Sequence, residues 1–392
     1  MDLETLRGIR TELDEYLGRF RDCFRRRESR EYLGVYVRGQ LGPLQRKSVE
    51  PIALDAGVHP RNLQQFLGYY SWDERRMAQK LRHIVRNEHG CAEGIGVIDE
   101  TGIAKKGNKT VGIQRQYCGS TGKVDNCVQS VHLDYVSPDF HTMVDSDLYL
   151  PQSWFDDPAR CDEAGVPEDL VFKTKPQIAL ELIARTLSDG VPIKWITADE
   201  GYGQVPEFMN GVAAQGLIYV VETPRHVLGW TPNGLRVGRE FDRVEDLWWR
   251  GGPTWTTYAV KDTTKGDLVW RARSTVFIPS WDPTKRLRLI VAEDMLTNEV
   301  KYFLSNAPLE TPVSSLLTVA FSRWNVERSF EDAKQEVGLD HFEVRGYRSV
   351  QRHHVVSMAS LLFLQRVSHR LRGEKGRAVD LCSGPGGDRR TA

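Results

Sequence analysis

The stretch Gly94-Ile-Gly-Val-Ile-Asp-Glu-Thr-Gly102 decides the fold. Its β-branched residues, with glycines at both ends, predict a short buried strand. We expect Asp99 to lie where this strand ends. A later stretch, Ile193-Lys-Trp-Ile-Thr-Ala-Asp-Glu-Gly201, repeats the pattern and places Asp199 at the end of another strand. Two carboxylates thus follow two strands, and the alternative interpretation is that both are merely solvated.

A predicted helix supplies a third carboxylate. It spans Phe321-Ser-Arg-Trp-Asn-Val-Glu-Arg-Ser-Phe-Glu-Asp-Ala-Lys334 and carries Glu327. Two aspartates and a glutamate are oxygen ligands of the kind that Mg²⁺ prefers. At about 100° per residue, Arg323, Glu327 and Lys334 share an apolar stripe, where charges are costly unless paired, hydrogen-bonded or bound to metal. An internal Arg323–Glu327 ion pair is the alternative, but it leaves Lys334 unexplained.

The composition is that of a soluble protein with a sizeable core. The 392 residues are 40% hydrophobic and carry a formal net charge of zero, so no overall basic excess points to nucleic acid. The six cysteines form no Cys-x-x-Cys pair, which argues against structural zinc and favours a reducing compartment. No segment is typical of a signal peptide, and none approaches the ~20 apolar residues of a membrane span. We therefore expect a cytoplasmic protein.

Residues 1–90 are predicted to form a helical DNA-binding domain. Within them, residues 49–68 resemble a helix-turn-helix, in which a second short helix begins near a proline. The exposed face of that helix would present polar side chains to base edges and phosphates, namely those of Arg61, Asn62 and Gln65. The alternative is an ordinary helical hairpin whose polar residues are only solvated.

A basic run in the same region strengthens the expectation of DNA binding. Residues 19–30 are rich in arginine and include Arg25, Arg26 and Arg27. Local basic patches matter more for DNA binding than the net charge of the whole chain.

Beyond residue 90 the pattern predicts an α/β fold. Residues 91–215 read as strand, strand, strand, helix, strand, which is the order in which ribonuclease-H-like folds begin. We therefore expect a mixed sheet flanked by helices, with this segment as the first part of a catalytic core. Residues 216–305 change to short β runs and are predicted to form an inserted β subdomain.

The last part of the chain is predicted to return to helices. Residues 306–373 would hold the catalytic helix and the C-terminal helices, and residues 374–392 a disordered tail. In the β insertion, Trp248 and Trp249 either pack in a core or stack on an unpaired base.

Here the sequence resembles a known family. The spacing Arg323-x-x-x-Glu327-x-x-x-x-x-x-Lys334 is similar to the signature box of bacterial insertion-sequence transposases in the DDE superfamily, the branch with a Tyr-Arg-Glu-Lys signature. The tyrosine of that box falls at Ala320, which is a departure; Phe321 and Trp324 are the nearest aromatic residues.

The resemblance covers about residues 90–345. Asp99 and Asp199 look like the two aspartates of the family, and the β insertion before Glu327 matches that branch. The resemblance implies that these three carboxylates hold two Mg²⁺ ions about 4 Å apart, which Mn²⁺ can replace.

The resemblance also implies the function and the partners. Arg323 and Lys334 would grip phosphates near the cut end, and the enzyme would cleave and rejoin DNA strands at the ends of an insertion sequence. Its partners would be double-stranded DNA, as terminal inverted repeats and target DNA, and a second copy of the chain in a homodimer, without a membrane or a small-molecule cofactor. We expect it at the nucleoid in the bacterial cytoplasm. The alternatives are a nuclease that only hydrolyses and a catalytically dead derivative that regulates by binding DNA.

Overall fold

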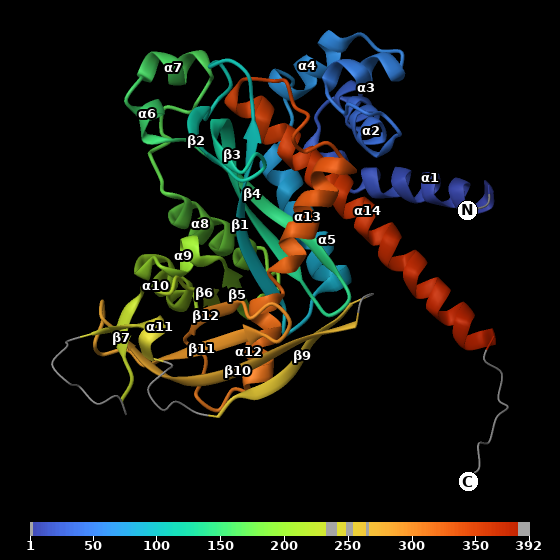
Figure 1. Ribbon diagram of the computed structural model, residues 1–392. Coiled ribbons are helices and arrows are strands. Elements are labelled where there is room, and N and C mark those ends of the chain that lie inside the picture. The colour runs from blue at the N-terminus through green and yellow to red at the C-terminus, as the bar shows by residue number, and fades with distance from the viewer. Residues whose placement is uncertain (1–2, 233–240, 248–253, 264–265, 383–392) are drawn as a thin grey trace.

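The computed structural model describes residues 3–232, 241–247, 254–263 and 266–382 (Figure 1). Trp248 and Trp249, for which the sequence left two interpretations, lie outside the described residues.

Helices precede the sheet, connect its strands and follow its last strand. Their bounds are α1 (Leu3–Gly18), α2 (Arg27–Leu41), α3 (Val49–Asp55), α4 (Pro60–Gly68), α5 (Glu74–His89), α6 (Gln152–Phe155), α7 (Pro158–Glu163), α8 (Lys175–Ser188), α9 (Glu200–Gly203), α10 (Pro206–Ala214), α11 (Val244–Leu247), α12 (Val313–Phe321), α13 (Trp324–Gln335) and α14 (Tyr347–Cys382).

The strands of the described ranges are hydrogen-bonded into one mixed sheet. Their bounds are β1 (Ile95–Ala104), β2 (Gln114–Cys118), β3 (Lys123–Val136), β4 (His141–Tyr149), β5 (Trp195–Ala198), β6 (Ile218–Glu222), β7 (Leu228–Trp230), β8 (Asp242–Arg243), β9 (Thr256–Thr263), β10 (Gly266–Pro279), β11 (Leu287–Asp294) and β12 (Val300–Ser305).

Five strands form the core of this sheet in the order β4-β3-β1-β5-β6. β1, β3 and β4 are antiparallel, whereas β5 and β6 run parallel to β1. Parallel neighbours need a crossover connection; α8 precedes β5, and α10 connects β5 to β6. This arrangement confirms the predicted α/β fold with a ribonuclease-H-like mixed sheet.

The β insertion continues the core sheet. The sequence placed the segment that forms β6 at the start of the insertion, but β6 pairs in parallel with β5 and is a core strand. β12 pairs with β6, β11 with β12 and β10 with β11, all antiparallel. The sheet therefore extends without interruption from β4 to the strands near the bottom of Figure 1.

Helices cover both faces of the core sheet. Because neighbouring side chains of a strand point to opposite faces, Asp134 and Leu133 on β3 face different layers. Asp134 lies against Ser329 of α13, whereas Asp145, which pairs with Leu133, contacts Arg185 of α8 at 2.7 Å. α13 and α8 thus occupy opposite faces, as Figure 1 also shows.

The N-terminal helices pack against α14. The Tyr16 hydroxyl of α1 donates to the Ala359 carbonyl at 2.9 Å, and the Gln40 amide of α2 donates to the Ser357 hydroxyl at 2.8 Å. Arg352, with 1% of its surface exposed, donates to backbone carbonyls that follow α4. α14 therefore joins the N-terminal helices to the core.

Two helices differ from the expectation. The helix predicted from Phe321 to Lys334 is interrupted, since α12 ends at Phe321 and α13 begins at Trp324. The Ser322 hydroxyl donates to the Val319 carbonyl at 2.6 Å, a local bond that competes with helical pairing at this point. α14 continues to Cys382, past the predicted start of the tail at 374, and residues 383–392 lie outside the described ranges.

Within the described ranges, none of the helices combines the length and the apolar character needed to cross a bilayer.

Candidate active site

Asp99 and Asp199 occupy equivalent places on neighbouring parallel strands. Ile98 of β1 pairs with Ala198 of β5, and each aspartate is the next residue along its strand. β5 ends at this point, as predicted, but β1 continues to Ala104 because β3 still pairs with it. Asp99 therefore lies inside a strand rather than at its end.

The two aspartates share a mostly buried environment. Burial, followed by the nearby charge of Asp199, raises the pKa of Asp99 to about 7. Burial and then the charge of Glu100 raise the pKa of Asp199, while Arg323 lowers the pKa of both. Like charges held together away from water create a demand for a cation.

Arg323 and Glu327 bring α13 to this pair of aspartates. The Arg323 guanidinium lies 3.1 Å from Glu327, 3.6 Å from Asp99 and 3.8 Å from Glu222. The ion pair between Arg323 and Glu327 that was the alternative interpretation of the stripe is therefore present. The side chain of Glu327 is 56% exposed, whereas that of Arg323 is 18% exposed.

The carboxylates fit a hard divalent cation in their chemistry, although they do not form a complete cage. The buried Asp99–Asp199 pair offers oxygen ligands and excess negative charge, which suit Mg²⁺ or Mn²⁺. Glu327 is turned to Arg323, and the described residues contain no group of three or more side chains arranged to hold a metal. Asp99 and Asp199 are thus available as ligands, and Glu327 would have to leave Arg323.

Two further glutamates, which sequence reasoning did not assign to the site, support it. Glu222, at the end of β6, receives Lys301 of β12 at 2.8 Å. Glu100 accepts from Lys175 at 2.6 Å and from the Tyr202 hydroxyl at 2.8 Å. Glu222 is a carboxylate at the end of a strand like Asp199, a signal that the assignment of its strand to the insertion concealed.

A second buried carboxyl lies behind Asp99. Asp134 on β3 is fully buried beside Ser329 of α13. Burial raises the pKa of Asp134 to about 8, so this carboxyl is mostly protonated at neutral pH. The protonated Asp134 carboxyl therefore places a neutral polar group against α13. A negative charge on Asp134 would be unfavourable there, because it would be buried and close to Asp99.

The turn after β5 explains the glycines that follow Asp199. The Asp199 carboxylate accepts from the backbone N–H of Gly201 at 2.9 Å and begins α9. A Cβ at Gly203 would lie 1.8 Å from the carbonyl oxygen of Glu222. Only glycine allows α9 to pack so closely on β6, which fixes Asp199 relative to Glu222.

Lys334 lies on α13 two turns beyond Glu327. It is partly buried, and burial lowers the pKa of its ammonium, while Asp340, Cys118 and Asp99 act in the opposite direction. No carboxylate of the described residues lies within ion-pair distance of Lys334, in contrast to Arg323. A cation without an ion-pair partner near Asp99 is placed to meet an external anion.

The aromatic residues around the box belong mainly to the core. Ala320, at the position of the family's tyrosine, is buried. Phe321 packs against Trp270 with ring centroids 4.7 Å apart and against Trp324 at 5.0 Å. Trp324 is therefore the partly exposed aromatic residue next to Arg323.

The candidate DNA-binding residues lie far from this site in sequence, on the N-terminal helices. α4 begins at Pro60, as predicted, with Arg61 exposed and Asn62 and Gln65 partly exposed. The basic residues Arg25, Arg26 and Arg27 are exposed at the N-terminal end of α2.

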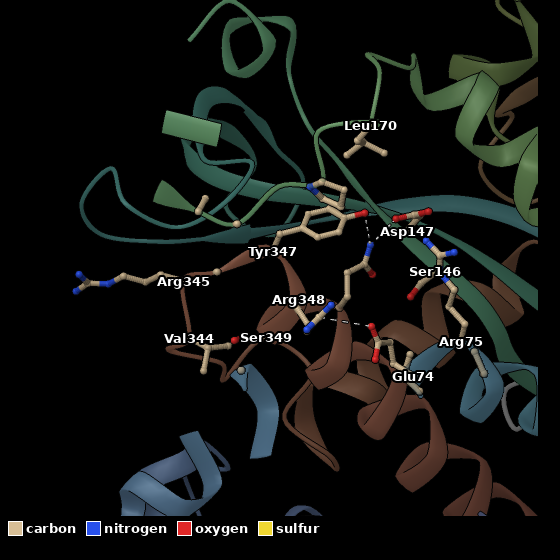
Figure 2. Close-up of a pocket in the computed structure, with 18 of the residues that line it drawn as sticks. Glu74, Arg75, Ser146, Asp147, Leu170, Val344, Arg345, Tyr347, Arg348 and Ser349 are labelled. Carbon is tan, nitrogen blue, oxygen red and sulfur yellow. Dashed lines mark hydrogen bonds and ion pairs between the residues drawn. The ribbon is translucent and has the colours of Figure 1, made fainter. Parts of the chain in front are cut away.

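A cavity of about 1340 Å³ lies away from the carboxylates. Figure 2 shows part of its wall, where Arg348 approaches Glu74 at 4.0 Å and Tyr347 lies beside Asp147. Its other lining residues come from α3, α4, α5, β4, α8 and the loop between α7 and α8. Four of the basic residues that line it, Arg82, Lys173, Arg185 and Arg348, pair with carboxylates of the same lining. Asp99 is not part of its lining.

Comparisons with known proteins agree with the geometry. A family model described as DDE superfamily endonuclease matches residues 19–267, more than half of the chain, and ends before Glu327. The probable transposase for insertion sequence element IS701 of Microchaete diplosiphon is 27% identical over 351 residues, which cover 86% of this chain and 83% of that protein. The NurA nuclease from Sulfolobus solfataricus, a solved structure, shares 8% identity over 66% of this chain and 89% of that chain, with a TM-score of 0.26.

Proposed function

The chain belongs to the DDE superfamily of endonucleases, and from this premise we propose that it is a transposase. It cleaves DNA at the ends of an insertion sequence and joins the freed strand to target DNA, with Mg²⁺ as the metal. The relative named a probable transposase, similar over most of both chains, supports this proposal. The one observation that carries it is the pairing of Ile98 with Ala198, which sets Asp99 beside Asp199.

We propose that Asp99, Asp199 and Glu327 are the metal ligands and the catalytic residues. Two bound Mg²⁺ ions would supply charge stabilisation to the attacking and leaving oxygens of the phosphodiester. The two aspartates would hold the metal ions in a fixed position, because the pairing of β1 with β5 fixes Asp99 and Asp199 relative to each other. The side chain of Glu327 is 56% exposed, compared with 15% for Asp99. Glu327 can therefore turn from Arg323 toward the aspartates when metal binds.

Arg323 and Lys334 are proposed to bind the DNA backbone next to the cut. Both cations lie on the side of α13 that is near Asp99. The planar guanidinium suits a bidentate contact to phosphate, whereas the ammonium acts as a point charge.

The N-terminal helices are proposed to bind the ends of the element. Arg61, Asn62 and Gln65 of α4 would contact one groove of the DNA, and the basic residues at the N-terminal end of α2 would contact phosphates. Cations at a helix N-terminus are unfavourable for the helix dipole, and a bound phosphate would offset that cost. A second copy of the chain would complete the complex as a homodimer.

An assay with labelled duplexes that carry the ends of the encoding element tests this function. With Mg²⁺ and a supercoiled target plasmid, a transposase produces both a cut end and a joined product. Cutting without joining would indicate a nuclease that only hydrolyses. Binding without cutting would indicate a DNA-binding regulator, and either result would contradict the proposal.

A further inference from the structure

Arg323 is shared among three carboxylates instead of being paired with one. Its Nη2 lies 3.1 Å from Glu327, its Nη1 3.6 Å from Asp99 and its Nε 3.8 Å from Glu222. A tight bidentate pair would bring two guanidinium nitrogens to about 2.7–2.9 Å from one carboxylate. Because its three contacts are longer than this, Arg323 interacts only weakly with each carboxylate.

Glu222 differs from the other two carboxylates in having a second cation. Lys301 lies 2.8 Å from Glu222, and both side chains are less than one-fifth exposed. Within the part of the chain that the structure describes, Asp99 and Glu327 form no ion pair except that with Arg323. Glu222 is thus held in place whether or not Arg323 contacts it.

The sheet separates Glu222 from Asp99. Their strands, β6 and β1, lie on either side of β5, so the strand axes are about 10 Å apart at the usual spacing. A guanidinium that moves toward Glu222 therefore moves away from Asp99. Arg323 and a metal ion compete for the same oxygens of Asp99 and Glu327, because each supplies the positive charge that these carboxylates lack.

We propose that Glu222 is a positioning residue that holds Arg323 away from Asp99 and Glu327 when a divalent cation binds there. The inference rests on the proposed function, since it takes Asp99 and Glu327 as metal ligands. Glu222 acts through Arg323 and does not itself bind the metal. The ion pair with Lys301 at 2.8 Å keeps Glu222 oriented for this purpose.

Binding of Mn²⁺ to the full-length protein without DNA tests this role. Free Mn²⁺ is followed by its electron paramagnetic resonance signal in the wild type, Glu222→Gln, Arg323→Gln and the double variant. We expect Arg323→Gln to bind Mn²⁺ roughly tenfold more tightly, because a competing charge about 4 Å away is removed. We expect Glu222→Gln to bind roughly threefold to tenfold more weakly, because Arg323 then remains on Asp99 and Glu327.

The double variant gives the decisive comparison. If Glu222 acts through Arg323, Glu222→Gln has no further effect once Arg323 is replaced, and the two single effects are not additive. If Glu222→Gln weakens binding equally in both backgrounds, Glu222 is itself a ligand and the proposal is wrong. An unchanged affinity in Arg323→Gln would also overturn it.

Two controls protect these conclusions. Arg328→Gln removes an exposed arginine of the same helix, paired with Glu331 and Asp332, and should leave Mn²⁺ affinity unchanged. If Arg323→Gln fails to fold, Arg323→Lys replaces it, because a compact ammonium cannot reach three carboxylates at once and should also tighten Mn²⁺ binding. Unchanged binding in Arg323→Lys would contradict the proposal.

The test separates this inference from the proposed function. A protein that shows the predicted Mn²⁺ affinities but cuts no DNA would contradict the function and support the role of Glu222. If the protein cuts and joins DNA but the wild type and Arg323→Gln bind Mn²⁺ with equal affinity, only the role of Glu222 is contradicted.

Discussion

Asp99 and Asp199 follow directly after a residue pair that joins two parallel strands, and the charge of Asp199 acts on Asp99. Burial and then the charge of Asp199 raise the pKa of Asp99 to about 7. The unfolded chain keeps this carboxyl near its ordinary pKa of about 3.9, so the folded protein holds the proton more tightly.

The pH dependence of stability follows from this relationship. The stability that protonated Asp99 contributes is fully present below about pH 4 and is lost as the pH rises toward 7. Asp99→Asn removes this loss, so the variant should gain stability over the wild type between pH 4 and 8, by up to about 4 kcal/mol. Urea unfolding in the presence of a chelator measures the difference. The exposed Asp169→Asn is the control, and an equal gain in both variants would contradict the account.

Arg352 should be a major contributor to the attachment of the N-terminal helices. It donates to the carbonyls of Tyr70 and Trp72, both at 2.8 Å, and pairs with Glu74 at 3.1 Å. Arg352→Met leaves these buried acceptors without a donor, so we expect a loss of about 3–5 kcal/mol in the free energy of unfolding. Arg348→Met, one turn earlier and exposed, should cost less than about 1 kcal/mol. Similar losses in the two variants, measured by urea unfolding, would show that the buried network is unimportant.

Lys334 should act on DNA and not on the fold. Lys334→Met should leave the free energy of unfolding within about 1 kcal/mol of the wild type, because no ion pair of the described residues is lost. Binding of the element's end should weaken, and the slope of log affinity against log salt should fall by about 1, as for one lost phosphate contact. Lys194→Met is the control, because Lys194 precedes the N-terminal end of β5, whereas Asp199 follows its C-terminal end. A Lys334 variant that unfolds easily but cuts normally would make Lys334 an architectural residue.

The basic residues at the N-terminal end of α2 should bind phosphates without reading sequence. Replacing Arg25, Arg26 and Arg27 by Ala should weaken binding to all duplexes alike and lower the salt slope by about 2–3. The test uses the full chain, since α1 and α2 bury side chains against α14. The exposed arginines of α1, Arg7 and Arg10, provide a control pair. An unchanged slope would remove the run from the DNA-binding surface.

Much of the fold could be predicted because its signals are local. Short runs of β-branched residues between prolines and glycines marked strands, and the predicted β character of residues 216–305 is confirmed by strands such as β6, β11 and β12. The sequence did not show which strands are neighbours. β6 was assigned to the insertion because strand pairing depends on contacts that periodicity does not record.

The site was predictable in its residue types but not in its contacts. The strand-end positions of the aspartates and the resemblance to the transposase signature grouped Asp99, Asp199 and Glu327 as one expected site. The structure brings Asp99 and Glu327 to the same guanidinium. β1 extends past Asp99 because β3 pairs with it, and the helix break at Ser322–Arg323 includes a hydrogen bond from the Ser322 hydroxyl to the Val319 carbonyl. Glu222 reaches the site only through the pairing of β6 with β5, a tertiary relationship that its own neighbours in sequence do not signal.

Cleavage of the element's ends shows whether Asp99, Asp199 and Glu327 form a metal-dependent cleavage site. Asp99→Asn, Asp199→Asn and Glu327→Gln are compared with the wild type in Mg²⁺, after DNA binding by each has been checked. The account predicts that each variant binds DNA but cuts at least about 1000-fold more slowly, a loss of roughly 4 kcal/mol of transition-state stabilisation. A variant that cuts at nearly the wild-type rate would remove its residue from the site and contradict the account.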